Sequence, residues 1–429
     1  MTPAAGSGVN PPLAVGVDVS SVERVRALLR RHPEFAVKYF TAGEVEYCRG
    51  RPERLAARWA AKEAVRKVFG SMGWPIPLYS RIAVVRLPGG APRALVGGEP
   101  VEGLAIALTH DAGLGIAVAA LSGRGPQSRW LWGRLPEDLE LPSRPSDGHK
   151  GTFGTVVVVA GSPAFPGAAV LCSLGALRGG AGKVKALVAG PETGSLPPEV
   201  IRVPVAASGS ALGPEALGQA QLALRSAQAV VCGPGLGQDG PVAGLLEGLF
   251  AAAGAAAWSL VLDADALNVC SAWPEVRRRI PRGSVLTPHP LEAARLAGME
   301  LSEVESDRQG FSARMAEQMG VVLVLKGAGT VVAAPDGRTW TDDHHTSVLA
   351  TGGTGDVLAG LIGSLLAQGL EPYQAARTGV FLHGEAGTRL GFLRGRAGIL
   401  ASEVAGALVE VQEAVRRQQE ATTARAERP

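Results

Sequence analysis

Cysteine and long apolar runs are both scarce in this chain of 429 residues. The four cysteines, Cys48, Cys172, Cys232 and Cys270, are widely spaced and form no Cys-x-x-Cys pair, which argues against a disulfide framework and a structural zinc site. We expect them to be small buried side chains in a reducing compartment. No stretch reaches the ~18 apolar residues of a membrane span, and the first residues lack the basic and apolar regions of a signal peptide. The sequence therefore predicts a cytoplasmic protein with no membrane partner.

Charged residues are also few, at 19% of the chain against 46% apolar residues, a balance that supplies real cores and excludes wholesale disorder. Glycine is abundant, with 58 residues, as is typical of tight strand-to-helix turns and of loops that hold phosphates. The net charge of +3 says little by itself, and no nucleic-acid partner is expected. However, 12 lysines and arginines lie between Arg24 and Lys67, either as a solvated helix surface or as a basic face for an acidic protein or a phosphorylated ligand.

A segment rich in Gly, Pro, Ser and charge, residues 123–148, divides the chain in two. Its composition is typical of a linker, so we expect a smaller first domain over residues 13–122 and a larger second domain over residues 149–410. The remaining residues, 411–429, are charged and low in apolar side chains, and they are expected to form a frayed tail.

The two domains differ in their apolar patterns. In the first, strands are predicted at 13–19, 81–87 and 114–121, and helices at 21–31 and 53–70. In the second, near-continuous apolar runs alternate with Ala- and Leu-rich helices; the runs are 155–161, 183–190, 229–235, 259–265, 283–289 and 321–327. Each of these runs ends in Gly, Asp or His, which is typical of strands buried on both faces of a parallel α/β sheet. Ligands bind such sheets beyond the C-terminal ends of the strands.

The strongest functional signal is ATGGTGDVLAG, residues 350–360. Its glycines immediately precede an Ala- and Leu-rich helix, so several backbone N–H groups can converge on an anion at the helix N-terminus. Asp356 falls in the first turn of that helix, where a carboxylate can accept a proton from a hydroxyl that attacks a phosphoryl group or is eliminated. The alternative is that Asp356 only caps the helix.

Further motifs accompany this one in the second domain. They are HKGTFG (149–154), GPGLG (233–237), LDADALN (262–268), TPHPLEAARL (287–296) and VLKGAGTVV (324–332). In this order and at these separations they resemble the ADP/ATP-dependent NAD(P)H-hydrate dehydratases, a branch of the ribokinase-like superfamily. TPHP followed by GTGD distinguishes that branch from the sugar kinases. The resemblance covers about residues 149–410 and implies a ribokinase-like α/β/α sandwich around a mostly parallel sheet.

The resemblance also implies roles for single residues. It makes Asp356 catalytic and places Gly355 on the phosphates of the nucleotide. The loop that would hold the adenine nucleotide consists of Lys326, Gly327, Ala328, Gly329 and Thr330. The positions around the hydrated nicotinamide substrate are Ala168, Gly237, His289 and Asp356.

Two further pairs of residues leave alternatives open. Asp263 and Asp265 lie at a predicted strand end, where one of them would orient a magnesium ion or the substrate, or both would cap a helix. His344 and His345 have no third ligand near them in the sequence, so we expect surface residues and not metal ligands. The family has a Gly-Asn pair where this chain has His345-Thr346, and Thr346 keeps a hydroxyl for hydrogen bonding.

The chemistry that the resemblance implies is repair of hydrated NADH and NADPH in the S configuration. The hydrate carries a hydroxyl on its reduced nicotinamide ring, and phosphoryl transfer from a nucleotide would turn that hydroxyl into a leaving group. Elimination then restores the ring, and with ADP as donor the products are AMP, phosphate and NAD(P)H. Spacing alone does not separate ADP from ATP as the donor. The alternative is a kinase that acts on the hydroxyl of another small molecule.

In the first domain, Asp18 ends a predicted strand, and Lys62 and Glu63 are neighbours on a predicted helix. Two carboxylates from separate elements suit a Mg²⁺ ion that bridges a pyrophosphate, and a lysine beside them would neutralise phosphate charge. Glu63, or water on the metal, would deprotonate an attacking serine hydroxyl. A solvated helix surface is the alternative for such a Lys-Glu pair.

FTAGE (40–44) before this pair and ALTHD (107–111) after it complete a pattern that resembles holo-acyl-carrier-protein synthase, an α+β enzyme. That enzyme moves 4′-phosphopantetheine from coenzyme A to a serine of acyl carrier protein. The resemblance covers about residues 13–122 and implies a homo-oligomer, a trimer with sites between subunits. The residue roles that it implies are magnesium binding by Asp18 and Glu63, coenzyme A binding by Lys62 and His110, and carrier contact by Arg24. The alternative is a non-catalytic module that only oligomerises the dehydratase.

Overall fold

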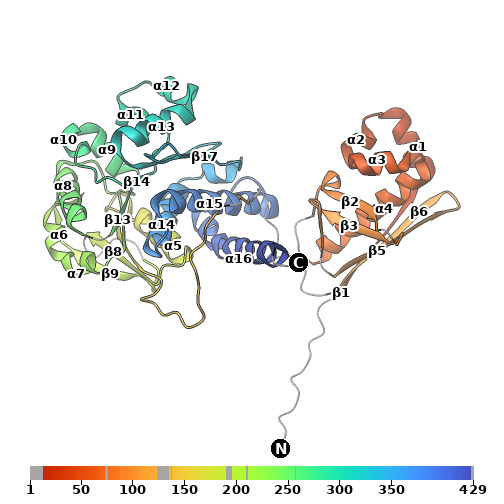
Figure 1. Ribbon diagram of the computed structural model, residues 1–429, viewed down its shortest axis with the longest axis horizontal. Coiled ribbons are helices and arrows are strands. Elements are labelled where there is room, and N and C mark those ends of the chain that lie inside the picture. Colours follow the sequence, from red (N-terminus) through yellow and green to blue (C-terminus); the bar gives the residue numbers. More distant parts are fainter. Residues whose placement is uncertain are drawn as a thin grey trace, which may run out of the picture. The chain divides into compact units, whose positions relative to one another are not determined.

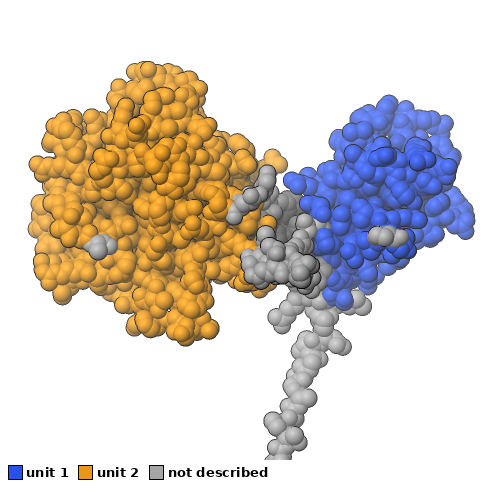
Figure 2. All heavy atoms as spheres, in the orientation of Figure 1, with its two compact units in different colours: residues 1–130 blue, residues 131–429 orange. Residues whose placement is uncertain are grey.

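A computed structural model describes residues 13–72, 76–87, 89–101, 103–122, 135–136, 138–189, 196–208, 211–256 and 258–426. The chain forms two compact units, unit 1 over Met1–Trp130 and unit 2 over Leu131–Pro429 (Figure 2). The division falls inside the segment whose composition is typical of a linker. Each unit has its own apolar core.

Unit 1 is an α+β structure in which a long helix packs on a three-stranded antiparallel sheet (Figure 1). Its elements are β1 (Leu13–Ser21), α1 (Val22–Arg31), α2 (Phe35–Tyr39), α3 (Ala42–Cys48), α4 (Pro52–Ser71), the 3₁₀ helix η1 (Tyr79–Arg81), β2 (Ile82–Arg86), β3 (Pro92–Val96), β4 (Glu99–Pro100), β5 (Leu104–Asp111) and β6 (Leu114–Ser122). The main sheet has the order β1-β6-β5, and β2-β3-β4 form a second one. The predicted strands and helices of this domain are confirmed, whereas β3, β4 and β5 were not expected as strands.

The helix α4 lies close to the main sheet because the strands present glycine to it. A Cβ atom on Gly16 of β1 would lie 2.1 Å from the carbonyl oxygen of Ala64. A Cβ atom on Gly115 of β6 would lie 2.4 Å from the backbone nitrogen of Ala57. Only glycine permits this approach. As a result, Asp18 and Glu63 fall on two elements in direct contact.

Unit 2 is built around a nine-stranded sheet of order β17-β16-β15-β14-β13-β12-β7-β8-β9 (Figure 1). Its strands are β7 (Thr155–Val159), β8 (Lys183–Ala189), β9 (Ile201–Val205), β12 (Ala229–Cys232), β13 (Ser259–Leu262), β14 (Val285–Leu286), β15 (Val322–Leu325), β16 (Val331–Ala333) and β17 (Thr339–Thr341), with a small hairpin of β10 (Ala207–Ser208) and β11 (Ala211–Leu212). All neighbours from β9 to β15 are parallel, and β16 and β17 add an antiparallel edge. The six predicted strands are confirmed in shorter form, and β9, β16 and β17 were not predicted.

Helices cover both faces of this sheet. They are α5 (Pro166–Arg178), α6 (Glu215–Gln219), α7 (Gln221–Arg225), α8 (Gly240–Ala255), α9 (Asp265–Ala272), α10 (Pro274–Arg277), α11 (Pro290–Ala297), α12 (Leu301–Ser306), α13 (Arg308–Met319), the 3₁₀ helix η2 (Ser347–Ala350), α14 (Thr354–Ala367), α15 (Pro372–Arg394) and α16 (Ala401–Ala426). One core joins the sheet to α5, α14, α15 and α16, and the other joins it to α6 through α13. Alternate residues of β7 enter the two cores, Val158 the first and Val157 the second. The predicted α/β sandwich is confirmed.

The end of the chain differs from the prediction of a frayed tail. The helix α16 continues to Ala426, and Val411 and Val415 are buried. The charged side chains lie on the outer face of this helix, where Arg417 pairs with Glu413 at 2.7 Å. A composition count averages the two faces, which is why it suggested fraying.

The second half of the expected linker also belongs to unit 2. Asp138 forms two hydrogen bonds of 2.6 Å with the guanidinium of Arg377 on α15. Leu139 is buried in the core, and its carbonyl oxygen accepts a hydrogen bond from Gln419 on α16. Residues 138–148 are therefore held against unit 2 by contacts with α15 and α16. The first part of the expected linker, 123–134, lies outside the described residues.

The four cysteines are buried free thiols, so the prediction that they are small buried side chains is confirmed. Burial raises the pKa of every one of these thiols, which keeps them protonated and unreactive. Within the described part of the chain, no helix is long and apolar enough to cross a membrane.

Candidate active site

The predicted functional residues of unit 2 gather where four neighbouring parallel strands end. The GPGLG loop follows β12, Asp263 follows β13, His289 follows β14 and Lys326 follows β15. The sheet order places these four strands side by side. Asp356 joins them from the first turn of α14, which packs on β12 and β13. The site therefore lies at the carboxyl edge of the sheet, where α/β folds bind ligands.

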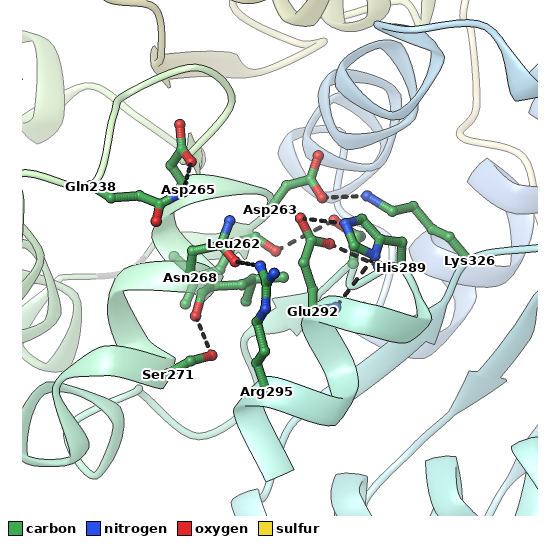
Figure 3. A network of polar contacts seen from close by, with 12 residues as sticks. Gln238, Leu262, Asp263, Asp265, Asn268, Ser271, His289, Glu292, Arg295 and Lys326 are labelled. Carbon is green, nitrogen blue, oxygen red and sulfur yellow. Dashed lines mark hydrogen bonds and ion pairs between the residues drawn. The ribbon is translucent and has the colours of Figure 1, made fainter. Parts of the chain in front are cut away.

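An ion pair between Asp263 and Lys326 lies at the centre of this site (Figure 3). The Nζ atom of Lys326 is 2.6 Å from Oδ1 of Asp263, whose side chain is only 1% exposed. A Cβ atom on Gly355 would lie 3.3 Å from the same Nζ, so the ammonium faces the N-terminus of α14. Burial lowers the pKa of Lys326, but the charges of Asp263 and Glu292 outweigh burial and raise it overall. A permanent cation and a helix N-terminus thus converge on one point, as a phosphate requires.

Asp356 has the electrostatics of a general base and not those of a helix cap. Burial, and then the negative charge of Asp263, raise the pKa of Asp356 to about 7, although Lys326 opposes the shift. A carboxylate that caps a helix accepts N–H bonds, which lower its pKa. A pKa near neutrality is what a proton-accepting group needs at physiological pH.

The two aspartates of LDADALN point to different partners because the residue between them has a strained backbone. Ala264 has φ 48° and ψ −116°, a region that residues with a Cβ atom rarely adopt. Oδ2 of Asp265 accepts a hydrogen bond of 2.9 Å from the backbone N–H of Gly237, and Oδ1 accepts another from Gln238 (Figure 3). Asp265 therefore positions the GPGLG loop, while Asp263 pairs with Lys326.

His289 begins α11 in a reciprocal cap with Glu292, a residue that the sequence interpretation missed. The backbone N–H of His289 donates to Oε2 of Glu292 at 2.8 Å, and Nδ1 of His289 accepts from the backbone N–H of Glu292 at 3.3 Å. Burial, and then the charge of Lys326, lower the pKa of His289, so the ring is neutral at pH 7. Its side chain is 48% exposed and open to a ligand. A glutamate three residues after the N-cap residue was the sequence signal that could have identified this capping box.

The loop expected to hold the nucleotide, residues 326–330, connects β15 to β16. Gly327 and Gly329 have φ values of 141° and 70°, which favour glycine. Arg308 on α13 supports the loop from behind, because its Nη2 donates to the carbonyl oxygens of Leu325 at 3.1 Å and Lys326 at 3.0 Å. Nothing in the sequence marked Arg308 for this task. Ala328 is exposed at the outer bend of the loop.

Ala168 lies against the GPGLG loop. A Cβ atom on Gly235 would come within 2.7 Å of the Cβ of Ala168, which is one reason that the loop carries glycine there. Phe165, at the start of α5, also borders Gly235, and its ring is 58% exposed. The expected substrate residues Ala168 and Gly237 therefore lie on one wall, formed by α5 and the GPGLG loop.

In unit 1, the predicted magnesium ligands Asp18 and Glu63 each have a polar partner. The hydroxyl of Tyr79 donates to a carboxylate oxygen of Glu63. Burial and this hydrogen bond raise the pKa of Tyr79 to about 12, and the charge of Asp18 contributes to the shift. Asp18 accepts a hydrogen bond of 2.8 Å from Nζ of Lys67. Asp18 on β1 thus pairs with a lysine of α4, Lys67, and Glu63 on the same helix bonds to Tyr79.

Lys62, the residue expected to contact coenzyme A, is buried in this structure. Its side chain is 0% exposed, and its Nζ lies 2.9 Å from Oε2 of Glu44. The same ammonium donates to the carbonyl oxygens of Tyr39 at 2.8 Å and Tyr79 at 2.9 Å, which uses all of its donors. Lys62 points inward because of its position on the helix. At about 3.6 residues per turn, Lys67, four positions after Glu63, lies on the same face as Glu63, whereas Lys62 does not.

His110 and Arg24 are both exposed. Asp18 and Leu108 are both paired with Ala117 of β6, so His110, two residues after Leu108, shares a face of the sheet with Asp18. Arg24 lies in the first turn of α1, where its backbone N–H donates to Ser21 at 3.3 Å. Both positions are accessible to a ligand or a partner.

The prediction that His344 is a surface residue is wrong. Its ring is buried between Asp342 and Glu385, and only His345 is exposed. The second carboxylate comes from α15, far along the chain, so neighbouring sequence gave no sign of it. In the described ranges, no cluster of three or more His, Cys, Asp or Glu side chains is arranged to hold a metal ion.

Two family models match the chain, one for each unit. The model described as NAD(P)H-hydrate dehydratase matches residues 156–409. The chain belongs to the NAD(P)H-hydrate dehydratase family. The model of the 4′-phosphopantetheinyl transferase superfamily matches residues 14–117. The chain is therefore a fusion of a dehydratase unit with an acyl-carrier-protein-synthase-like unit, as the sequence motifs predicted.

Curated relatives match the dehydratase unit. An ADP-dependent (S)-NAD(P)H-hydrate dehydratase of Neisseria meningitidis is 40% identical over 272 residues, which cover 62% of this chain and 87% of that protein. A bifunctional NAD(P)H-hydrate repair enzyme of Moorella thermoacetica is 37% identical over 270 residues, covering 62% of this chain and 50% of that enzyme. The chain thus spans only half the length of the second relative.

Solved structures match the dehydratase unit as well. The ADP/ATP-dependent NAD(P)H-hydrate dehydratase of Bacillus subtilis, co-crystallised with ATP and Mg²⁺, aligns with a TM-score of 0.54 and 31% identity over 64% of this chain and 94% of that one. A ribokinase-like superfamily protein of Enterococcus faecalis aligns with a TM-score of 0.55 and 25% identity over 64% of this chain and 92% of that one. The predicted ribokinase-like fold of the dehydratase unit is confirmed.

Proposed function

We propose that unit 2 dehydrates the S form of hydrated NADH and NADPH with ADP as the phosphoryl donor. The observation that carries the proposal is Asp356, a carboxylate of pKa about 7 in the first turn of α14, beside the ion pair of Lys326 and Asp263. The name of the Neisseria relative supports the S form and ADP, and the Bacillus structure supports either ADP or ATP as donor.

In the proposed reaction Asp356 accepts the proton of the substrate hydroxyl while the hydroxyl oxygen attacks the terminal phosphorus of ADP. The bond between that phosphorus and AMP breaks, and AMP leaves. Lys326 and the backbone N–H groups at the start of α14 stabilise the negative charge on the transferred group. The phosphate ester then leaves the ring as the adjacent ring carbon loses a proton, which restores the double bond of NAD(P)H.

The donor can be tested by supplying ADP or ATP to the full chain with hydrated NADH and following the recovery of NADH absorbance. Faster recovery with ADP than with ATP supports the proposal, and AMP is then the nucleotide product. Asp336→Asn, a change at an exposed aspartate in the turn between β16 and β17, is the matched control for Asp356→Asn. Recovery by Asp356→Asn at the rate of the control would remove Asp356 from the mechanism.

We further propose that unit 1 transfers 4′-phosphopantetheine from coenzyme A to a serine of acyl carrier protein. Asp18 and Glu63 would hold Mg²⁺, an ion that usually takes one or two carboxylates and completes its coordination with substrate phosphates and water. When bound, the ion would neutralise the pyrophosphate of coenzyme A. Support comes from the family match over residues 14–117 and from the contact between β1 and α4, the elements that carry Asp18 and Glu63.

Lys67 replaces Lys62 in this proposal as the lysine that meets the pyrophosphate. Its side chain is 52% exposed, and it already lies 2.8 Å from Asp18. His110 shares the sheet face of Asp18 and would contact coenzyme A, and Arg24 would meet the acidic carrier. The test is the mass of apo-carrier protein after incubation with the full chain, Mg²⁺ and coenzyme A. No mass increase would leave unit 1 as a non-catalytic module.

Unit 1 is also proposed to bring the chains together as a homo-oligomer, a trimer. The face of the main sheet opposite α4 carries Val15, Val17 and Val19, which are 52%, 49% and 54% exposed. Val118 of β6 stands beside Val17 and is 38% exposed. A contiguous row of exposed apolar side chains on a sheet is typical of a surface that another subunit covers.

The oligomer can be tested by light scattering of the full chain. The wild-type protein is expected at the mass of a trimer, and Val17→Lys is expected to dissociate it because a charge would be buried in the contact. Val37→Lys, at an apolar residue that is 76% exposed on α2, is the matched control and should leave the mass unchanged. A monomeric wild type would contradict the proposal.

We place the enzyme in the cytoplasm. The four cysteines are free thiols, which is typical of proteins in reducing compartments. Cell fractionation with an antibody against the chain tests this location, and recovery from an oxidising compartment would contradict it.

A further inference from the structure

The segment between β17 and η2, residues 342–346, borders the nucleotide loop of unit 2. The backbone N–H of Asp342 donates to the carbonyl oxygen of Thr330 at 2.9 Å. A Cβ atom on Gly329 would lie 3.8 Å from Cε1 of His345. Residues 342–346 therefore form a wall beside the nucleotide loop that none of the roles assigned above includes.

His344 fastens this wall to the interior of the unit. Its Nδ1 lies 2.8 Å from Oδ1 of Asp342, and its Nε2 lies 2.9 Å from Oε2 of Glu385 on α15. The three side chains are 4%, 6% and 0% exposed. A Cβ atom on Gly384 would lie 2.7 Å from Nδ1 of His344, so α15 leaves just enough room for the ring.

Both ring nitrogens of His344 face carboxylate oxygens. Burial lowers the pKa of His344, but the hydrogen bonds and charges of Asp342 and Glu385 outweigh burial and raise it to about 9. Charge-assisted hydrogen bonds at both ends of a rigid ring define one position for the segment. The neighbouring His345 is then held outward, exposed beside Gly329.

The position of His345 along the nucleotide loop indicates which part of a nucleotide it meets. Lys326, at the start of the loop, faces Gly355 and the N-terminus of α14, where the phosphates would bind. Gly329 lies three residues farther along the loop, away from that point. An imidazole beside Gly329 can donate to or accept from a ribose hydroxyl, or stack on a base.

We propose that His345 contacts the nucleoside part of the bound nucleotide and that His344 is the positioning residue that holds it there. The proposal rests on the nucleotide-dependent activity proposed above. Because His344 already joins the segment to Glu385 on α15, little conformational entropy is lost when the nucleotide binds.

The test is direct binding of ADP, AMP and pyrophosphate to the full chain by calorimetry. His345→Ala should lower the affinity for ADP and AMP by about three- to tenfold, because one hydrogen bond to a neutral partner is lost. The affinity for pyrophosphate should not change. His345→Asn keeps a donor and an acceptor and should recover most of the affinity. Asp336→Asn, at an exposed residue in the turn between β16 and β17, should bind as the wild type does.

His344→Gln tests the positioning role, because it removes the charge and one of the two anchoring bonds. It should lower the affinity for ADP as much as His345→Ala does. The two changes together should lower the affinity no further than His344→Gln alone. Equal ADP affinity for His345→Ala and wild type overturns the contact. Weakened pyrophosphate binding by His345→Ala overturns its assignment to the nucleoside. A wild-type protein that binds no ADP contradicts the proposed function itself.

Discussion

The ammonium of Lys326 lies 2.6 Å from Oδ1 of Asp263, and this pair sets the electrostatics of the dehydratase site. Burial, and then the charge of Asp263, raise the pKa of Asp356 to about 7, and the charge of Lys326 opposes this shift. The same ammonium faces Gly355, where the transferred phosphate would bind. One ion pair thus links the proton acceptor to the anion site.

Removing Lys326 should destabilise unit 2 and abolish dehydration. Lys326→Met leaves Asp263 as an unpaired carboxylate that is 1% exposed, which costs about 3–5 kcal/mol. The double change Lys326→Met with Asp263→Leu should recover most of this free energy of unfolding without recovering activity. Urea unfolding of both variants measures the difference. A single variant as stable as the wild type would show that the pair does not stabilise the unit.

The pH dependence of dehydration should follow the ionisation of Asp356. Since its pKa is about 7, kcat/KM should fall about tenfold for each pH unit below 7 and level off above it. Asp356→Asn should abolish dehydration and leave carrier modification by unit 1 intact. A flat profile between pH 5 and pH 8 would exclude Asp356 as the base.

The ionised carboxylate of Asp356 should lower the free energy of unfolding of unit 2. Its folded pKa of about 7 lies above its ordinary value of 3.8, so ionisation disfavours the folded state progressively above about pH 4. Asp356→Asn should therefore be more stable than the wild type by about 1–3 kcal/mol at pH 8, and the difference should vanish near pH 4. Denaturant unfolding at the two pH values measures it.

Lys62 and Lys67 should respond oppositely to substitution. Lys62→Met leaves Glu44, which is 2% exposed, without its cation and should destabilise unit 1 by about 3–5 kcal/mol. Lys67→Met, at a half-exposed side chain, should keep the fold and raise the KM for coenzyme A. Calorimetric unfolding and transferase kinetics on the full chain separate the two outcomes. A stable Lys62→Met protein with a raised KM would restore the original assignment.

The stability that His344 contributes to unit 2 should be lost at high pH. Its folded pKa of about 9 exceeds its ordinary value of 6.5, so its contribution is complete below about pH 6.5 and is lost as the pH rises through 9. His344→Gln should be less stable than the wild type by about 2–3 kcal/mol at pH 6, and the gap should narrow by pH 10. The Tm of both proteins across this range provides the comparison.

Local signals were enough to predict which residues of unit 2 lie together at one edge of the sheet. Asp263, His289 and Lys326 each follow an apolar run, and parallel strands bring the ends of such runs to one edge. Asp356 was marked by the glycines before it. The position of each of these residues could be predicted because the strand or helix that places it is its immediate neighbour in the sequence.

Pairings between distant segments were not accessible in this way. The second carboxylate on His344, Glu385, lies 41 residues away on α15, so the sequence made a buried cation look like a surface residue. The burial of Lys62 was not expected because its partner Glu44 lies on a different helix. The edge strands β16 and β17 have three residues each, too short for any period to be read.

The stoichiometry of the dehydratase tests the central claim most directly. The full chain is supplied with ADP and the S form of hydrated NADPH, and AMP, phosphate and NADPH are counted as the reaction proceeds. The predicted result is one AMP and one phosphate for each NADPH, with none of the three formed by Asp356→Asn. AMP formation with a stable phosphorylated product and no NADPH would contradict the account and identify unit 2 as a kinase.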